Sequence, residues 1–279
     1  MKSQNKILTL LLISRPIFVF LQLLPFILGF LYSKAQFSFI FLFQLILITL
    51  PYSFFLYGIN DIYDYETDLK NERKKDIQGV KLKKQLHPYV KNISLAIVIL
   101  LLISSLLTRN LFNISAMAVL IFISYFYSAP PLRLKTKPPL EELISAIGYV
   151  LIPFMLGFSF GSTFNNLPFQ IYMIALVGAG VHALSTIVDF ESDKKAKDNT
   201  LAVAFGKRTA AIFSVIGLAV AIIFGSFSSP IILANLYLIL ASSISLAIFP
   251  KAKLAHILIA ILYLLFIVSV FALIIIKIF

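Results

Sequence analysis

The chain has 279 residues, of which 60% are hydrophobic and 13% are charged, and its mean hydropathy is +0.97. A soluble domain carries about 25% charged residues and about 45–50% apolar ones, so this composition indicates a membrane protein. The absence of cysteine excludes disulfides, thiolate metal sites and cysteine nucleophiles. The formal net charge of +12 would suggest a nucleic-acid partner in a soluble chain, but basic cytoplasmic loops explain it in a membrane protein, and we expect no such partner.

Apolar stretches of about 20 residues, long enough to cross about 30 Å of hydrocarbon, recur along the chain. They predict an all-α polytopic membrane protein with nine transmembrane helices in a bundle around a central cavity. The charged segments 59–90 and 189–207 are expected to be loops that cap the bundle. The nine predicted spans are residues 16–33, 38–58, 91–107, 111–128, 141–161, 167–188, 208–228, 230–249 and 254–276.

The charge distribution predicts the orientation in the membrane. With a cytoplasmic N-terminus, all basic residues except Lys34, Arg109 and Lys277 lie on the cytoplasmic side. All 12 carboxylates fall on that side as well. Because acidic residues contribute little to orientation, this clustering indicates a local function for them.

Two acidic motifs follow the second and the sixth predicted spans. Residues 64–68 read DYETD and residues 189–193 read DFESD, so both have the pattern acid, aromatic, acid, hydroxyl, acid. Four spans separate them, which places both on the same side of the membrane. The repetition favours an internally duplicated bundle.

Helical spacing aligns oxygen ligands in each motif. Asn60, Asp64 and Asp68 share one helix face if the second helix continues through them, and Asp189 and Asp193 share another. The carboxylates within such a row repel one another unless a cation neutralises them. Oxygen-only ligands favour magnesium, manganese or calcium. Magnesium fills its remaining positions with water and substrate phosphates, so the rows predict a metal-bound diphosphate; solvated loop charges are the alternative. The predicted metal ligands are Asn60, Asp61, Asp64, Asp68, Asp189 and Asp193.

A basic segment follows the fourth predicted span. Residues 127–137 read YSAPPLRLKTK, and the prolines are expected to end the helix and to hold the chain extended. Arg133, Lys135 and Lys137 would then point the same way, towards a common anion, unless they only anchor lipid head groups. Lys74 and Lys194, next to the acidic motifs, are candidates for the same anion.

The sequence resembles the UbiA superfamily of intramembrane prenyltransferases. Residues 60–68 (NDIYDYETD) resemble its NDxxDxxxD motif, residues 189–193 its second DxxxD motif, and residues 127–135 (YSAPPLRLK) its YSxPxxxK-type segment. The resemblance implies a single domain over residues 1–279 in which Mg²⁺ and the diphosphate of a prenyl donor bind to the two motifs. It further implies that Arg133 and Lys135 lie near the phosphates. The catalytic residues implied are Asn60, Asp64, Asp68, Asp189 and Asp193.

The implied reaction ionises a polyprenyl or dimethylallyl diphosphate and transfers the prenyl group to a lipophilic acceptor among the membrane lipids. Residues 64–74 around the first motif, residues 130–140 after the fourth span, and His182 most resemble the lycopene elongase branch, which implies a carotenoid acceptor. An aromatic acceptor, as in quinone biosynthesis, and a glycerol-phosphate lipid are alternatives. A cation-coupled transporter is the alternative from another class, but no acid falls in the interior of a predicted span, where transporters place their binding groups.

Three further residues are candidates for the substrate cavity. Tyr57 and Tyr127 offer π faces to a carbocation, although interfacial anchoring also explains tyrosines at these depths. His182 lies two helical turns before Asp189 on roughly the same face. It is a candidate for acceptor contact, and a polar side chain satisfied by a neighbouring helix is the alternative.

Overall fold

The computed structural model describes residues 6–70 and 82–278, and within these ranges every regular element is helical. The chain divides into two compact units, Met1–Arg133 with Met155–Ser162, and Leu134–Phe154 with Thr163–Phe279. One acidic motif lies in each unit. The helical fold is confirmed, whereas the single domain, the central cavity and the internal duplication stay predictions.

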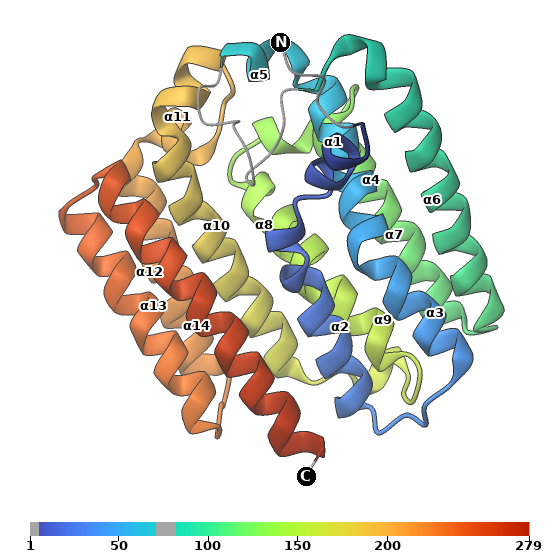
Figure 1. Cartoon of the computed structure of the whole chain (residues 1–279). Helices are drawn as coiled ribbons and strands as arrows, with labels where there is room; N and C mark the ends of the chain where they lie inside the picture. The colour runs from blue at the N-terminus through green and yellow to red at the C-terminus, as the bar shows by residue number, and fades with distance from the viewer. Residues whose placement is uncertain (1–5, 71–81, 279) are drawn as a thin grey trace. The chain divides into compact units, whose positions relative to one another are not determined.

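In the first unit, α3, α4, α6 and α7 pack against one another (Figure 1). A kink at Thr49, followed by Pro51, separates α3 from α4 within one span. The helices of this unit are α1 (Lys6–Ile13), α2 (Phe20–Tyr32), α3 (Phe39–Ile48), α4 (Leu50–Tyr63), α5 (Tyr65–Lys70), α6 (His87–Leu107) and α7 (Leu111–Ser128), and it also contains the last four residues of α9 (Ile152–Phe158).

In the second unit, α10 packs against α8, α11, α12 and α14. Small residues allow this close approach: Ala183 on α10 lies in one buried cluster with Ala210, Ala211 and Ala255. The helices are α8 (Leu140–Ala146), α10 (Phe169–Ala196), α11 (Leu201–Phe205), α12 (Lys207–Phe224), α13 (Pro230–Ile248) and α14 (Ala252–Ile278), and a π-helical turn, Ile147–Leu151, links α8 to α9.

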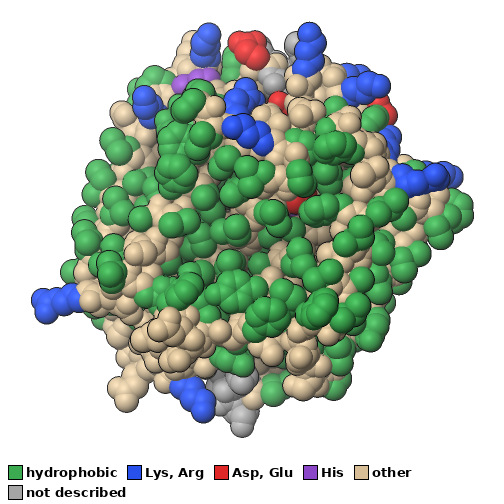
Figure 2. Space-filling view, turned by 180° about the vertical axis from the view of Figure 1, so that it is seen from behind, with side chains coloured by type: hydrophobic (Ala, Val, Ile, Leu, Met, Phe, Trp, Pro, Cys, Tyr) green, Lys and Arg blue, Asp and Glu red, His purple; other side chains and the backbone are tan. Residues whose placement is uncertain are grey.

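Eight helical segments among the described residues are long and apolar enough to cross a membrane. The remaining predicted span, the first in the chain, is a shorter apolar segment, Pro16–Tyr32, because a 3-10 turn at Pro16–Phe18 precedes α2. Hydrophobic side chains cover most of the face drawn in Figure 2, with few charged side chains among them. This surface matches lipid rather than water, and the chain is an integral membrane protein.

The described parts of the two segments predicted as loops are largely helical, which corrects the sequence-based boundaries. From residue 59 onward, α4 continues to Tyr63 and α5 follows at once. After residue 189, α10 continues to Ala196 and α11 begins at Leu201. Charged residues mark where the chain leaves hydrocarbon, but a helix in water retains its backbone hydrogen bonds, so a change in hydropathy does not end it.

A buried amide pair links helices of the first unit. The side chains of Gln44 on α3 and Asn113 on α7 are fully buried and exchange two hydrogen bonds of 3.0 Å. The Asn113 amide also donates to Ser159 Oγ at 2.8 Å, and its oxygen accepts from Ser105 Oγ at 2.5 Å. Four segments of the unit are thus tied together inside the apolar layer, where an unpaired amide is costly.

Replacing one member of this pair is expected to destabilise the protein more than replacing both. Asn113→Leu leaves the buried Gln44 amide without its main partner, which costs about 2 kcal/mol. The double variant Gln44→Leu/Asn113→Leu removes both amides and is expected to be more stable than Asn113→Leu alone. Unfolding in detergent micelles measures this, with Ser245→Ala as control because its exposed hydroxyl bonds only to Ala241 O in its own helix. A double variant with the summed losses of both single variants would contradict the pairing.

Candidate functional site

The first acidic motif forms a row of oxygen ligands at the end of α4. The backbone N–H of Asp64 bonds to Asn60 O at 2.9 Å, and that of Asp68 bonds to Asp64 O at 2.8 Å, so helical spacing continues across the junction with α5. The Asn60 amide donates to Asp64 Oδ2 at 2.6 Å and to Ser128 Oγ at the end of α7 at 2.9 Å. Asp64 and Asp68 are buried. The row is therefore prearranged, with Asn60 held between two helices.

Arg15 contacts the same row from the chain before α2. Its Nη2 donates to Asp61 Oδ1 at 2.9 Å and lies 3.5 Å from Asn60 Oδ1. Its guanidinium also covers the ring of Tyr57, 4.4 Å from the centroid. Asp61, predicted as a metal ligand, thus shares a buried ion pair, and its metal role stays a prediction. The only signal of Arg15 in the sequence is a lone basic residue before Pro16.

The basic segment after α7 is not extended, which corrects the prediction for residues 127–137. Arg133 adopts a left-handed conformation, with φ 41°, and its N–H bonds to Ala129 O. Leu134–Thr136 then forms a 3-10 turn. An unpaired strand would leave backbone groups without partners, whereas these local turns satisfy them. The alternation of Arg133, Lys135 and Lys137 consequently does not give them a common direction.

Arg133 and Lys135 instead contact carboxylates, each within its own unit. Arg133 Nη2 bonds to Asp64 Oδ1 at 3.2 Å. Lys135 Nζ lies 3.5 Å from Asp198 Oδ2, five residues after the second motif. These two of the four predicted diphosphate-binding residues therefore lie beside acidic residues of the candidate site.

The second acidic motif lies on α10, which runs through it without a break. Asp189 and Asp193 are one turn apart and half-buried. The Thr200 hydroxyl donates to Asp193 Oδ2 at 3.2 Å. Lys194 Nζ lies over the ring of Phe190, 5.8 Å from its centroid. The role of Lys194 in diphosphate binding stays a prediction, and Lys74 lies outside the described residues.

The remaining candidates occupy different places along the helices. Tyr57 is buried beneath Arg15, Tyr127 is half-buried near the end of α7, and His182 is half-buried on α10. Ser185 Oγ donates to the His182 carbonyl at 2.7 Å, which is a helix-internal bond. A cavity role for these three residues stays a prediction.

The donor chemistry fits a hard divalent cation. Among the described residues, no three His, Asp or Glu side chains converge on one point. Mg²⁺ commonly takes one or two protein carboxylates and completes its shell with water and phosphate oxygens, so a pair such as Asp189 and Asp193 is sufficient. Oxygen donors beside Arg and Lys suit a metal-bound phosphate group.

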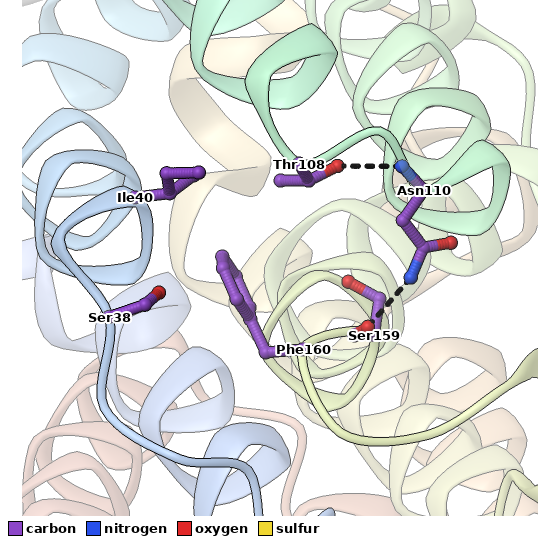
Figure 3. A pocket seen from close by; sticks show the side chains of 6 residues that line it. All are labelled: Ser38, Ile40, Thr108, Asn110, Ser159 and Phe160. Carbon is purple, nitrogen blue, oxygen red and sulfur yellow. Dashed lines mark hydrogen bonds between the residues drawn. The ribbon is translucent and has the colours of Figure 1, made fainter.

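A pocket of about 440 Å³ lies in the first unit at the opposite end of the span that carries Asn60 (Figure 3). Its polar groups bond within the protein: Asn110 Nδ2 donates to Ser159 O at 2.8 Å, and Asn110 N–H to Thr108 Oγ1 at 3.2 Å. No carboxylate lines it. The pocket therefore offers none of the chemistry of the acidic motifs.

Known proteins are similar to this chain in sequence. A model described as the UbiA prenyltransferase family matches residues 22–257. A lycopene elongase/hydratase of Corynebacterium glutamicum is 30% identical over 219 residues, covering 76% of this chain and 74% of the relative. The C(50) beta-cyclic carotenoids biosynthesis protein LbtBC of Dietzia sp. is 29% identical over 209 residues, which are 74% of this chain and 48% of that protein.

Solved structures share the fold. A UbiA homolog from Archaeoglobus fulgidus bound to DMAPP and Mg²⁺ is 23% identical, with a TM-score of 0.69, and the match covers 94% of this chain and 99% of that one. A second structure of a UbiA homolog from the same organism is bound to GPP and Mg²⁺. The helical architecture of the chain is therefore one already known in membrane proteins.

Proposed function

The chain belongs to the UbiA prenyltransferase family and is a prenyltransferase. From this premise we propose that it ionises an allylic diphosphate in a Mg²⁺-dependent reaction and transfers the prenyl group to a lipophilic acceptor. The observation that carries this proposal is the pair of acidic motifs, one at the end of α4 and one in α10, each with a basic residue beside it. The DMAPP, GPP and Mg²⁺ in the Archaeoglobus structures support the choice of donor and metal.

In the proposed function, Asn60, Asp64 and Asp68 of the first unit bind Mg²⁺ and diphosphate oxygens, and Asp189 and Asp193 of the second unit do the same. When bound, Mg²⁺ supplies Lewis-acid stabilisation of the departing diphosphate. Arg133 and Lys135 bind phosphate oxygens, which requires them to exchange their carboxylate partners for the substrate, and Lys74 and Lys194 supplement this charge.

The apolar helices complete the proposed mechanism by excluding water. A prenyl carbocation reacts with water rapidly, so the donor must ionise where hydrocarbon side chains surround it. Tyr57 and Tyr127 present aromatic faces to the cation, and His182 contacts the acceptor. The N-terminus and both motifs face the cytoplasm, as the basic residues indicate.

We assign a carotenoid such as lycopene as the acceptor, because relatives in Corynebacterium and Dietzia carry carotenoid names. An aromatic or glycerol-phosphate acceptor is the alternative within the same chemistry. Cation-coupled transport is disfavoured because the acidic motifs lie towards the ends of their helices, whereas transporters bind ions near the midplane.

Feeding the purified protein with defined substrates tests the acceptor. With dimethylallyl diphosphate, Mg²⁺ and lycopene, we expect a carotenoid product extended by five-carbon units, detected by mass spectrometry. Parallel reactions contain an aromatic acid or a glycerol-phosphate lipid, each with short and long donors. Alkylation of only an aromatic acid would contradict the carotenoid assignment and leave the prenyl-transfer assignment intact.

A further inference from the structure

The geometry points to Glu141 as a positioning residue for the second acidic motif: it accepts the first N–H of α11 and thereby fixes the backbone at Thr200, whose hydroxyl orients Asp193. This inference rests on the proposed function, because it assumes that Asp193 binds the metal-bound diphosphate. By sequence alone, Glu141 and Glu142 look like ordinary acidic residues in the first turn of a helix. Their burial is what sets them apart, since Glu141 is only 1% exposed.

The contact of Glu141 joins two separate parts of the second unit. Its Oε1 accepts the backbone N–H of Leu201, the first residue of α11, at 2.7 Å. Six residues before it, Lys135 pairs with Asp198. The segment 135–141 therefore holds the chain between α10 and α11 at two points, Asp198 and Leu201.

The usual cap of α11 is engaged elsewhere. Thr200 occupies the N-cap position with extended backbone angles, yet its side chain makes no capping bond to the helix. Its hydroxyl instead donates to Asp193 Oδ2 at 3.2 Å. A threonine at this position would ordinarily accept from a backbone N–H of the first turn. Glu141 accepts the N–H of Leu201, the residue directly after Thr200, and so fixes the backbone at the start of α11 from α8.

The surrounding structure fixes the position of Thr200. Leu201 and Ala202 are buried in the same cluster as Leu184 and Ile187 of α10. The Asp198 N–H bonds to Asp193 O at 3.0 Å, after Lys197 reverses the chain with φ 61°. A hydrogen bond from such a fixed hydroxyl restricts the rotamer of Asp193, and residues that orient a metal ligand in this way typically change metal affinity about 10- to 100-fold when replaced.

The test is the Mg²⁺ dependence of diphosphate release. We expect Glu141→Leu to raise the half-saturating Mg²⁺ concentration about tenfold, because the Leu201 N–H loses its acceptor and the backbone that positions Thr200 is no longer fixed. Glu141→Gln retains an acceptor for Leu201 N–H and is expected to stay within about threefold of the wild type. Thr200→Val, which lacks the hydroxyl, is expected to raise the half-saturating Mg²⁺ concentration as much as Glu141→Leu does. The double variant is expected to raise it no further than either single variant.

The neighbouring Glu142 provides the matched control. It is as buried as Glu141, its carboxyl group lies next to that of Glu141, and among the described residues it makes no hydrogen bond to α11. Glu142→Leu is expected to leave the half-saturating Mg²⁺ concentration unchanged. The inference is overturned if Glu141→Leu leaves it unchanged, if Glu141→Gln fails to restore it, or if Glu142→Leu raises it equally. A wild-type protein that releases no diphosphate at any Mg²⁺ concentration would instead reject the proposed function.

Discussion

Replacing Asp64 or Asp189 by alanine is expected to abolish Mg²⁺-dependent release of diphosphate. Each variant removes a carboxylate from one of the two motifs, so the charge that develops on the leaving group is no longer stabilised. Removing one preorganised electrostatic contact of this kind typically costs at least about 100-fold in rate. Release of inorganic diphosphate from dimethylallyl diphosphate, followed at saturating Mg²⁺, measures the loss.

Exposed acidic residues of the same motifs serve as controls. Glu66 and Glu191 are exposed, and Glu66→Ala and Glu191→Ala are expected to retain activity. Gel filtration in detergent shows whether each inactive variant remains folded. Full activity in both Asp64→Ala and Asp189→Ala would reject the assignment of the motifs.

Breaking the ion pair between Arg15 and Asp61 is expected to have the largest effect on stability. The pair is nearly enclosed, with the side chains 14% and 0% exposed, and the guanidinium also packs on Tyr57. Arg15→Leu removes a cation that lies 2.9 Å from a buried carboxylate, and breaking a buried pair from one side typically costs about 3–5 kcal/mol. Arg15→Lys keeps the charge but loses the planar fork, and an intermediate loss is expected. Unfolding in detergent micelles gives the comparison.

Two further variants distinguish the loss of stability caused by breaking this pair from the effect of removing a charge in general. Arg15→Leu/Asp61→Asn removes both charges and is expected to recover part of the stability lost in Arg15→Leu. Glu191→Ala breaks the pair with Lys207 from its exposed side, since the Glu191 carboxylate is 67% exposed, and should cost about 1 kcal/mol or less. Equal losses in Arg15→Leu and Glu191→Ala would contradict a structural role for the buried pair.

The sequence predicts the membrane architecture well because hydropathy measures directly which segments suit hydrocarbon. It also identifies both acidic motifs, since the four-residue spacing of Asn60, Asp64 and Asp68 persists in the structure. Sequence-based prediction is wrong where the backbone geometry does not depend on hydropathy. The charged ends of α4 and α10 are helical although they resemble loops, and the alternating basic segment turns at Arg133.

Contacts between distant residues are the other part of the site that the sequence does not reveal. Arg15 is 46 positions from Asp61, and Glu141 is 60 positions from Leu201. No periodicity links such pairs, because only the packing of the helices brings them together. Hydrogen-bond geometry then shows that Thr200 donates to Asp193 instead of capping its own helix.

Binding of one diphosphate is expected to require both acidic motifs. The most direct test is equilibrium binding of a thiodiphosphate analogue of dimethylallyl diphosphate, which ionises slowly. Purified protein is dialysed against the analogue with and without Mg²⁺. The account predicts one Mg²⁺-dependent analogue bound per chain, and its loss in Asp64→Ala and in Asp189→Ala alike. Retention of one bound analogue with wild-type affinity in either variant would show that the two motifs do not act on the same ligand.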